Sequence, residues 1–196
     1  MTDQTLPESS ITFSGFSVDA LECCLEYGAA KLSRIISEDS LTLLRDKGVP
    51  QSPALLSTRM PEIEGFLNLL DIRDLEDNKL VVDVIDPYPN IGSVMEAHVD
   101  STARKGVSLL VPYIGSRALF SCDTGPYDIN NNPRFQTTYG PGDAILLRQT
   151  INSVNHEPRS LNQAWHMGVA SACRTLITID YLSDHIAVRE SLTDNK

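Results

Sequence analysis

A histidine and an aspartate stand one residue apart near the middle of the chain, as His98-Val99-Asp100. Side chains along a β-strand alternate between its two faces, so residues i and i+2 point the same way. In a strand, His98 and Asp100 would therefore reach one metal ion together. This spacing makes the two residues candidate metal ligands.

A site of this kind needs a third protein ligand, and His166 is our first choice. It lies in Trp165-His166-Met167-Gly168-Val169, which has the apolar character of a strand. Two histidines and one carboxylate on one face of an octahedron leave three positions open, which is the arrangement of non-haem iron(II) oxygenases. The open positions would take a bidentate 2-oxo acid and then dioxygen.

His156 is a rival for the third ligand. It stands in Asn155-His156-Glu157-Pro158, whose composition is typical of a loop. His166 is preferred because it lies within apolar alternation and because its interval to Arg174 suits a tight hairpin. If His166 is the ligand, His156 contacts the substrate or faces solvent.

Arg174 begins the last predicted strand, eight residues after His166. A guanidinium deep inside a barrel needs an anionic partner. The distal carboxylate of a 2-oxo dicarboxylic acid would provide one through a bidentate pair. An aspartate or glutamate of the protein is the alternative partner.

The second half of the chain reads as a series of short strands separated by turn residues. Eight are predicted, which is the number expected for a jelly roll, at 79–86, 93–98, 106–112, 117–121, 135–139, 143–149, 164–169 and 174–182. The predicted fold is mainly β with N-terminal helices (α+β), built on a double-stranded β-helix core.

The segment before these strands reads as helical. Ser17 is a candidate N-cap for a helix over 18–36, Ser40 for a short helix that ends before Gly48, and Pro61 opens a helix over 61–70. Pro50 and Pro53 mark a loop. With 196 residues, the chain suits one domain, 1–196, in which a helical segment, residues 1–78, packs on a catalytic core, residues 79–183.

Composition narrows the classes of partner. The formal net charge is −10 and there is no basic cluster, so nucleic acid is not an expected partner. The apolar runs are too short to cross a bilayer, and the N-terminus lacks the pattern of a signal peptide. We therefore expect a cytoplasmic protein that does not bind membranes. Its four cysteines form no Cys-x-x-Cys motif, which argues against a zinc site or a redox pair.

Segment 86–100 resembles a pattern of the iron(II)/2-oxoglutarate-dependent dioxygenase superfamily. In that pattern a tyrosine precedes a glycine-containing turn and the His-x-Asp ligands follow, as Tyr88, Gly92 and His98-Val99-Asp100 do here. The likeness extends over about residues 81–182. Gly142-Asp143 before an apolar strand is similar to the family's approach to the distal histidine.

The segment from Arg174 is similar to the final strand of the family, with two departures. Isopenicillin-synthase-like members have Arg-x-Ser there, whereas Leu176 stands in the place of the serine. DNA-repair members carry a second arginine six residues after the first, whereas this chain has Asp180. The second departure, like the acidic net charge, argues against the DNA-repair branch.

The resemblance implies the cofactors and the reaction. Fe(II) would be bound by His98, Asp100 and the distal histidine, and 2-oxoglutarate would be held by Arg174 and Tyr88. The implied activity is the oxidation, most often hydroxylation, of a small organic molecule by dioxygen, with release of succinate and carbon dioxide. The hard chemistry belongs to the cofactor, and the protein positions the reactants.

Two other readings of the sequence stay open. One is a cupin-type metalloenzyme that does not use 2-oxoglutarate, although cupins usually present His-x-His and a later glutamate. The other is a non-catalytic jelly-roll binding module. The sequence does not specify the substrate or the oligomeric state.

Overall fold

The structure is a computed structural model that describes residues 11–46, 53–70, 80–84, 94–98, 106–122, 133–149 and 165–181. The elements in chain order are β1 (Thr12–Phe13), α1 (Val18–Tyr27), β2 (Ala29–Leu32), α2 (Glu38–Arg45), α3 (Pro53–Arg59), α4 (Pro61–Leu69), β3 (Leu80–Val84), β4 (Val94–His98), β5 (Val107–Cys122), β6 (Phe135–Tyr139), β7 (Ala144–Arg148) and β8 (Trp165–Tyr181). The described helices all precede β3, and the later described elements are strands.

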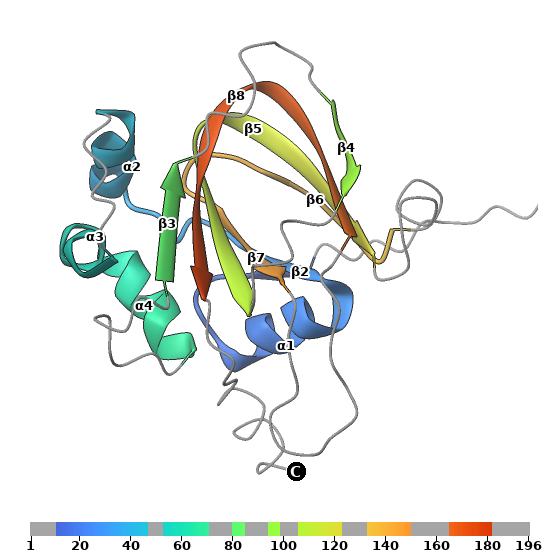
Figure 1. The fold of residues 1–196 in the computed structure, drawn as a ribbon, viewed down its shortest axis with the longest axis horizontal. Coiled ribbons are helices and arrows are strands. Elements are labelled where there is room, and N and C mark those ends of the chain that lie inside the picture. Colours follow the sequence, from blue (N-terminus) through green and yellow to red (C-terminus); the bar gives the residue numbers. More distant parts are fainter. Residues whose placement is uncertain are drawn as a thin grey trace, which may run out of the picture.

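The described strands form one eight-stranded sheet (Figure 1). Its main path runs β1-β2-β7-β5-β8-β3, while β4 pairs with β8 and β6 pairs with β5. Apart from the parallel pair β1–β2, the pairings along this sheet are antiparallel. The two long strands β5 and β8 lie at the centre and connect all the others.

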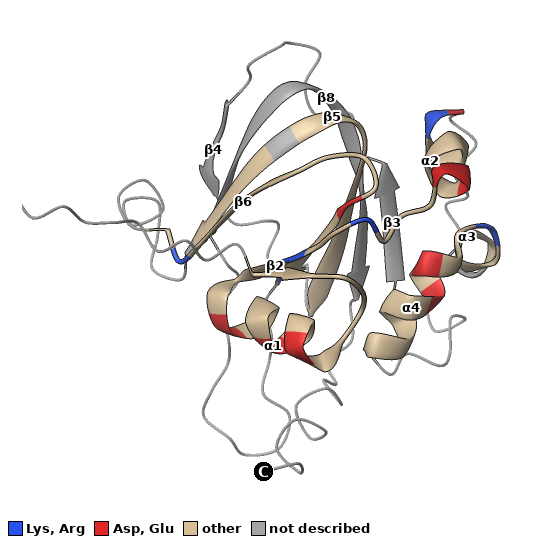
Figure 2. Cartoon of the chain, turned by 180° about the vertical axis from the view of Figure 1, so that it is seen from behind, with Lys and Arg blue, Asp and Glu red and all other residues tan. Residues whose placement is uncertain are grey.

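Helices pack on one face of this sheet and present acidic side chains to the outside. Exposed acidic residues on these helices include Asp19 in α1, Glu38 and Asp39 in α2, and Glu64 in α4, and Figure 2 shows acidic positions along the helices. The core between helices and sheet contains alternate residues of β5, namely Val107, Leu109, Val111 and Tyr113. Alternate burial of this kind is expected of a strand with two different faces.

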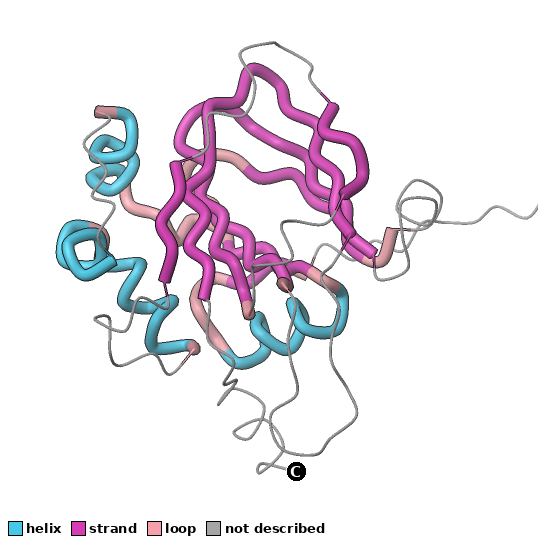
Figure 3. The backbone as a smooth tube through the Cα atoms, in the orientation of Figure 1, coloured by secondary structure: helices cyan, strands magenta, loops and turns pink. Residues whose placement is uncertain are grey.

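The other face of the sheet encloses a second cluster, because the strands curve around it (Figure 3). The buried members of this cluster are all strand residues: Ala29, Leu110, Leu119, Phe135, Tyr139, Ile145 and Leu147. We call the face that carries them the inward face. Residues directly opposite one another in an antiparallel pair share a face, so the register assigns further positions to it.

β5 and β8 are each one continuous strand where the sequence predicts two. The predicted strands 106–112 and 117–121 merge in β5, and 164–169 and 174–182 merge in β8. The ladder between β5 and β8 continues across a register shift between Ile114 and Ser116. Gly115 lies at this shift with φ 73°, a left-handed conformation that glycine adopts without a steric penalty. The glycine therefore bends the ladder instead of ending it.

The first helix is shorter than predicted. Ser17 is its N-cap, as expected, and its side chain accepts a hydrogen bond from the Ala20 backbone N–H. The prediction that the helix reaches residue 36 is wrong, because Gly28 ends it with φ 89° and donates its N–H to the Cys24 carbonyl. The chain then enters β2, which pairs with β7. The N-terminal segment is thus not purely helical, since β1 and β2 extend the sheet of the later strands.

Two other helix predictions need correction. Ser37, not Ser40, caps α2, and Ser40 instead donates its hydroxyl to Glu62 Oε2 at 2.7 Å. Pro53 does not mark a loop, because it opens α3, where a proline is tolerated in the first turn. The helix predicted from Pro61 is present as α4.

The described helices are all too short or too polar to cross a lipid bilayer.

Candidate metal centre

The two preferred histidines occupy opposed positions in the sheet. β4 pairs antiparallel with β8, and His98 lies opposite His166 in that register, after an irregularity between Met95 and His98. Positions directly opposite in an antiparallel pair lie on the same face, with Cβ atoms roughly 5 Å apart. His98 and His166, which lie 68 positions apart in the chain (166 minus 98), are therefore neighbours in the sheet.

The register also assigns these histidines to the inward face. His166 lies opposite Ser121 of β5, and Ser121 lies opposite Phe135 of β6. Phe135 is 1% exposed and belongs to the inward cluster. We call the four positions Phe135, Ser121, His166 and His98 the histidine row, because they follow one another across four adjacent strands.

The histidine row is tied to its surroundings through Ser121, which is fully buried. Its hydroxyl donates to the Tyr27 carbonyl at 3.0 Å, and its carbonyl accepts from the Arg134 backbone N–H at 2.9 Å. The Arg134 guanidinium lies over the Tyr27 ring, 5.4 Å from its centroid. These contacts fix the end of α1 and the start of β6 against the strand that pairs with His166.

Arg174 also occupies an inward position. It lies opposite Ile114 of β5. Pro112 and Ile114 follow the inward residue Leu110 by two and four residues, so all three positions share one face of that strand. The expected hairpin between His166 and Arg174 is wrong, because both residues lie on β8. They share a face of one continuous strand that bends between them.

The remaining predicted site residues lie outside the described residues. These are Asp100, which follows the end of β4 by two residues, Tyr88, and the rival histidine His156. Among the residues that the structure describes, no group of three or more His, Cys, Asp or Glu gathers to hold a metal. An iron(II) site of this kind needs two histidines and one carboxylate. Of the three proposed ligands, the described residues include the two histidines, His98 and His166.

Polar residues with no role predicted from the sequence occupy other inward positions. Gln149 donates from Nε2 to Ser108 Oγ at 2.8 Å, and these side chains are 1% and 0% exposed. Thr137 and Tyr139 are likewise buried on β6. The alternation along Phe135–Tyr139 is the sequence signal that could have identified Thr137 and Tyr139, because both lie on the same buried face of the strand as Phe135.

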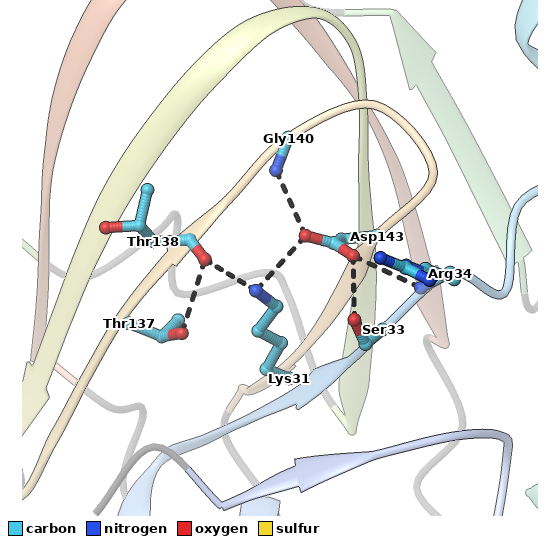
Figure 4. A network of polar contacts seen from close by, with 7 residues as sticks. All are labelled: Lys31, Ser33, Arg34, Thr137, Thr138, Gly140 and Asp143. Carbon is cyan, nitrogen blue, oxygen red and sulfur yellow. Dashed lines mark hydrogen bonds and ion pairs between the residues drawn. The ribbon is translucent and has the colours of Figure 1, made fainter. Parts of the chain in front are cut away.

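The turn between β6 and β7 is held by a polar network around Asp143 (Figure 4). Asp143 Oδ2 pairs with Lys31 Nζ at 3.2 Å, and Oδ1 accepts from Ser33 Oγ at 3.2 Å and from the Arg34 backbone N–H at 3.1 Å. Lys31 Nζ also donates to the Thr138 carbonyl at 2.7 Å. The resemblance predicts that Gly142-Asp143 leads toward a distal histidine. In the structure these residues form the turn that connects β6 to β7 and binds it to β2.

The network shifts the pKa of Asp143. Burial on its own would raise the pKa, but hydrogen bonds from the Arg34 backbone and from Lys31, together with the charge of Lys31, outweigh it. The net effect is a pKa below the ordinary value of an aspartate. The carboxylate is therefore charged at neutral pH and serves as a structural anchor.

Comparison with known proteins gives structural neighbours. No family model and no curated protein matches the chain. One solved structure that is similar is a prolyl-4-hydroxylase from Pseudomonas putida, at a TM-score of 0.45 and 10% identity, over 86% of this chain and 94% of that one. Another is the non-heme alpha-ketoglutarate-dependent epimerase SnoN from nogalamycin biosynthesis, at 0.48 and 13% identity, over 87% and 89%.

Proposed function

We propose that the chain is an iron(II)- and 2-oxoglutarate-dependent dioxygenase with a double-stranded β-helix (jelly-roll) core, which oxidises a small organic molecule. The observation that carries the proposal is the pairing of His98 with His166 on the inward face. Asp100 stands two residues after His98. Two histidines and one carboxylate are the donor set of iron(II) oxygenases that activate dioxygen at open coordination positions.

The strand arrangement supports a jelly-roll core. β5 and β8 bend, and the two halves of these strands form two arms of the curved sheet. In one arm β4 pairs with β8 and β6 pairs with β5, and in the other β3 pairs with β8 and β7 pairs with β5. An apolar cluster lies between the arms. This is how a jelly roll encloses a site between two antiparallel sheets.

Each proposed site residue has a defined task. His98, Asp100 and His166 would hold iron(II), with His156 as the alternative to His166. Arg174 would pair with the distal carboxylate of 2-oxoglutarate in bidentate fashion. Tyr88 would donate a hydrogen bond to the 2-oxoglutarate molecule. Dioxygen would supply the oxidising power at the iron, with 2-oxoglutarate as the co-substrate that is oxidised to succinate and carbon dioxide, and hydroxylation is the outcome that we propose. Apolar inward residues in and beside the histidine row, such as Phe135 and Leu119, would exclude water from the reacting groups.

The proposed partner is a small molecule and not a polyanion. The net charge is −10, and the outer helices carry acidic side chains (Figure 2). Such a surface repels nucleic acid and anionic lipid headgroups. A cytoplasmic location belongs to this proposal.

The test is the weak visible charge-transfer band that iron(II) and a chelated 2-oxo acid give without oxygen. The wild-type protein, His166→Ala, His156→Ala and Asp100→Ala are compared after anaerobic addition of iron(II) and 2-oxoglutarate. The proposal expects a band that His166→Ala and Asp100→Ala lose and His156→Ala keeps. Loss only in His156→Ala would keep the enzyme class and replace the third ligand. A folded, iron-loaded wild type without a band would favour the cupin or the binding module.

A further inference from the structure

Ser121 joins the histidine row to the end of helix α1. Its side chain is 0% exposed, and its position in the row is between Phe135 and His166. Its hydroxyl donates a hydrogen bond to the carbonyl of Tyr27, the last residue of α1, with 3.0 Å between the two oxygen atoms. The row thus contains a buried hydroxyl whose proton is directed at the helix.

The carbonyls at the end of α1 need donors from elsewhere in the chain, because the last four carbonyls of a helix have no partner within it. Gly28 ends the helix, and the buried Arg148 side chain donates to the Leu25 carbonyl. Ser121 provides a donor for the Tyr27 carbonyl in the same way. Completing the helix end is one task of this serine, and it uses the hydroxyl proton.

The Ser121 oxygen has a further capacity, because a hydroxyl group offers one proton and two lone pairs. Since the proton goes to Tyr27, the oxygen can only accept from another neighbour. Neighbouring positions on the same face include Leu119 on β5, Phe135 across β6 and His166 across β8. Of these three side chains, only the histidine has an N–H group.

We propose that Ser121 is a positioning residue for His166, and that its oxygen accepts a hydrogen bond from Nδ1–H of this histidine when Nε2 binds the metal. The proposal rests on the proposed function. Opposed Cβ atoms lie roughly 5 Å apart, and Nδ1 is the ring nitrogen nearer to the backbone, so a short serine side chain reaches it. Nε2 then keeps its lone pair for the metal, since a neutral imidazole carries one N–H proton.

The same arrangement connects the metal ligand to the dipole of α1. The C-terminal end of a helix carries a partial negative charge, and Tyr27 is the final residue of this ten-residue helix. The hydrogen bonds from His166 to Ser121 and from Ser121 to Tyr27 run in one direction, so each strengthens the other. An acceptor of this kind makes the imidazole a better ligand. Removal of the hydroxyl therefore weakens metal binding although Ser121 is not itself a ligand.

Metal affinity of the full chain tests the positioning role. Binding of cobalt(II), used in place of iron(II), is measured by anaerobic titration calorimetry for the wild type, Ser121→Ala and Ser121→Thr. Loss of an outer-shell partner costs roughly tenfold to a hundredfold in metal affinity, and this is the loss expected for Ser121→Ala. Ser121→Thr keeps a hydroxyl at the same position and is expected to recover most of the affinity.

Ser108→Ala is the matched control. Ser108 is also 0% exposed on the inward face of β5, and its hydroxyl accepts a hydrogen bond from Gln149 at 2.8 Å. It lies opposite Asp180 instead of His166. Its removal is expected to lower stability and to leave the cobalt(II) affinity unchanged. The comparison separates the general cost of losing a buried hydroxyl from an effect on the histidine.

A spectroscopic measurement on the wild type tests the proposal even if Ser121→Ala does not fold. In the zinc(II)-loaded protein, which is diamagnetic, nitrogen-15 NMR identifies the coordinated ring nitrogen of His166. Its signals are assigned by their loss in His166→Gln. Coordination through Nε2, with a slowly exchanging proton on Nδ1, is the expected result.

The negative outcomes are distinct. Wild-type cobalt(II) affinity in Ser121→Ala, or coordination of His166 through Nδ1, would overturn the positioning role and leave Ser121 as a partner of α1 alone. Equal losses of affinity in Ser121→Ala and Ser108→Ala would overturn it too. His166→Gln with wild-type metal affinity would overturn it and favour His156 as the third ligand within the same enzyme class. A wild type that binds no metal would overturn the proposed function, and the inference with it.

Discussion

Lys31 and Asp143 join β2 to the turn between β6 and β7, with 3.2 Å between Nζ and Oδ2. Both side chains are 17% exposed, so the pair is shielded more than a typical surface ion pair. Its partners include backbone groups of two other segments, Arg34 and Thr138. The pair therefore ties β2 to β6 and to the turn that leads into β7.

Asp143→Asn should lower the free energy of unfolding at neutral pH by about 1–2 kcal/mol, because the amide loses the charge-assisted contacts. The pKa of Asp143 is lowered in the folded protein, so its contribution is present above the unfolded-state pKa, about 3.9. It is lost as the pH falls from there through the folded pKa. Urea unfolding of both proteins from neutral to acidic pH measures this. Asp46→Asn, at an exposed position, is the control, and an equal loss in both variants would contradict the assignment.

His98→Ala should reduce metal affinity strongly, because it removes one of the two paired histidines. Loss of an outer-shell partner already costs roughly tenfold to a hundredfold in other proteins, and loss of a ligand should cost at least as much. Titration calorimetry with iron(II) or cobalt(II) without oxygen gives the comparison. His185→Ala is the matched histidine control, because His185 follows the last predicted strand, 174–182, and is not among the proposed ligands. Wild-type affinity in His98→Ala would remove the basis for a metal site here.

Gly65→Ala should destabilise the protein. A Cβ atom at this position would lie 2.7 Å from Cδ2 of Phe16, whose ring packs against Phe66 with centroids 6.2 Å apart. The gain in helix propensity of about 1 kcal/mol opposes an overpacking cost of about 1–3 kcal/mol. We expect a net loss of about 1 kcal/mol in urea unfolding. Gly15→Ala, where a Cβ atom meets nothing within 4 Å, is the control, and a stabilised Gly65→Ala would show that the Phe16 ring moves freely.

Gln149→Leu should cost about 1–3 kcal/mol of stability, because it removes a hydrogen bond to the buried Ser108 hydroxyl. Ser108→Ala and the double variant complete a cycle in which the two effects should not add. The exposed Gln136→Leu on β6 should change stability by less than about 0.5 kcal/mol. Additive effects in the cycle would mean that the two side chains act independently.

Local signals in the sequence predicted much of the strand pattern. Phe135–Tyr139 alternates buried and exposed residues as its sequence suggests. Ala144–Arg148 is buried throughout, as expected for an apolar run between two packed faces. Ser17 and Pro61 were recognised as helix starts because capping and first-turn preferences depend only on neighbouring residues.

Two of the wrong predictions depend on contacts between distant segments. The helix predicted over 18–36 has apolar residues on one side, yet Gly28 stops it and β7 recruits the following residues as β2. The sequence predicts separate strands at 106–112 and 117–121, whereas pairing with β8 carries β5 across Gly115. The opposition of His98 to His166 is a matter of register between distant strands, which is not encoded in either segment alone.

The continuity of β8 has a consequence for insertions and deletions in the gene. His166 and Arg174 lie eight positions apart, an even interval, on one continuous strand. Because side chains alternate faces, gaining or losing one codon between them would turn one of the two residues away from the interior, unless a new bulge absorbs the change. Loops of this chain can vary in length, whereas the spacing between these two residues can change only in steps of two.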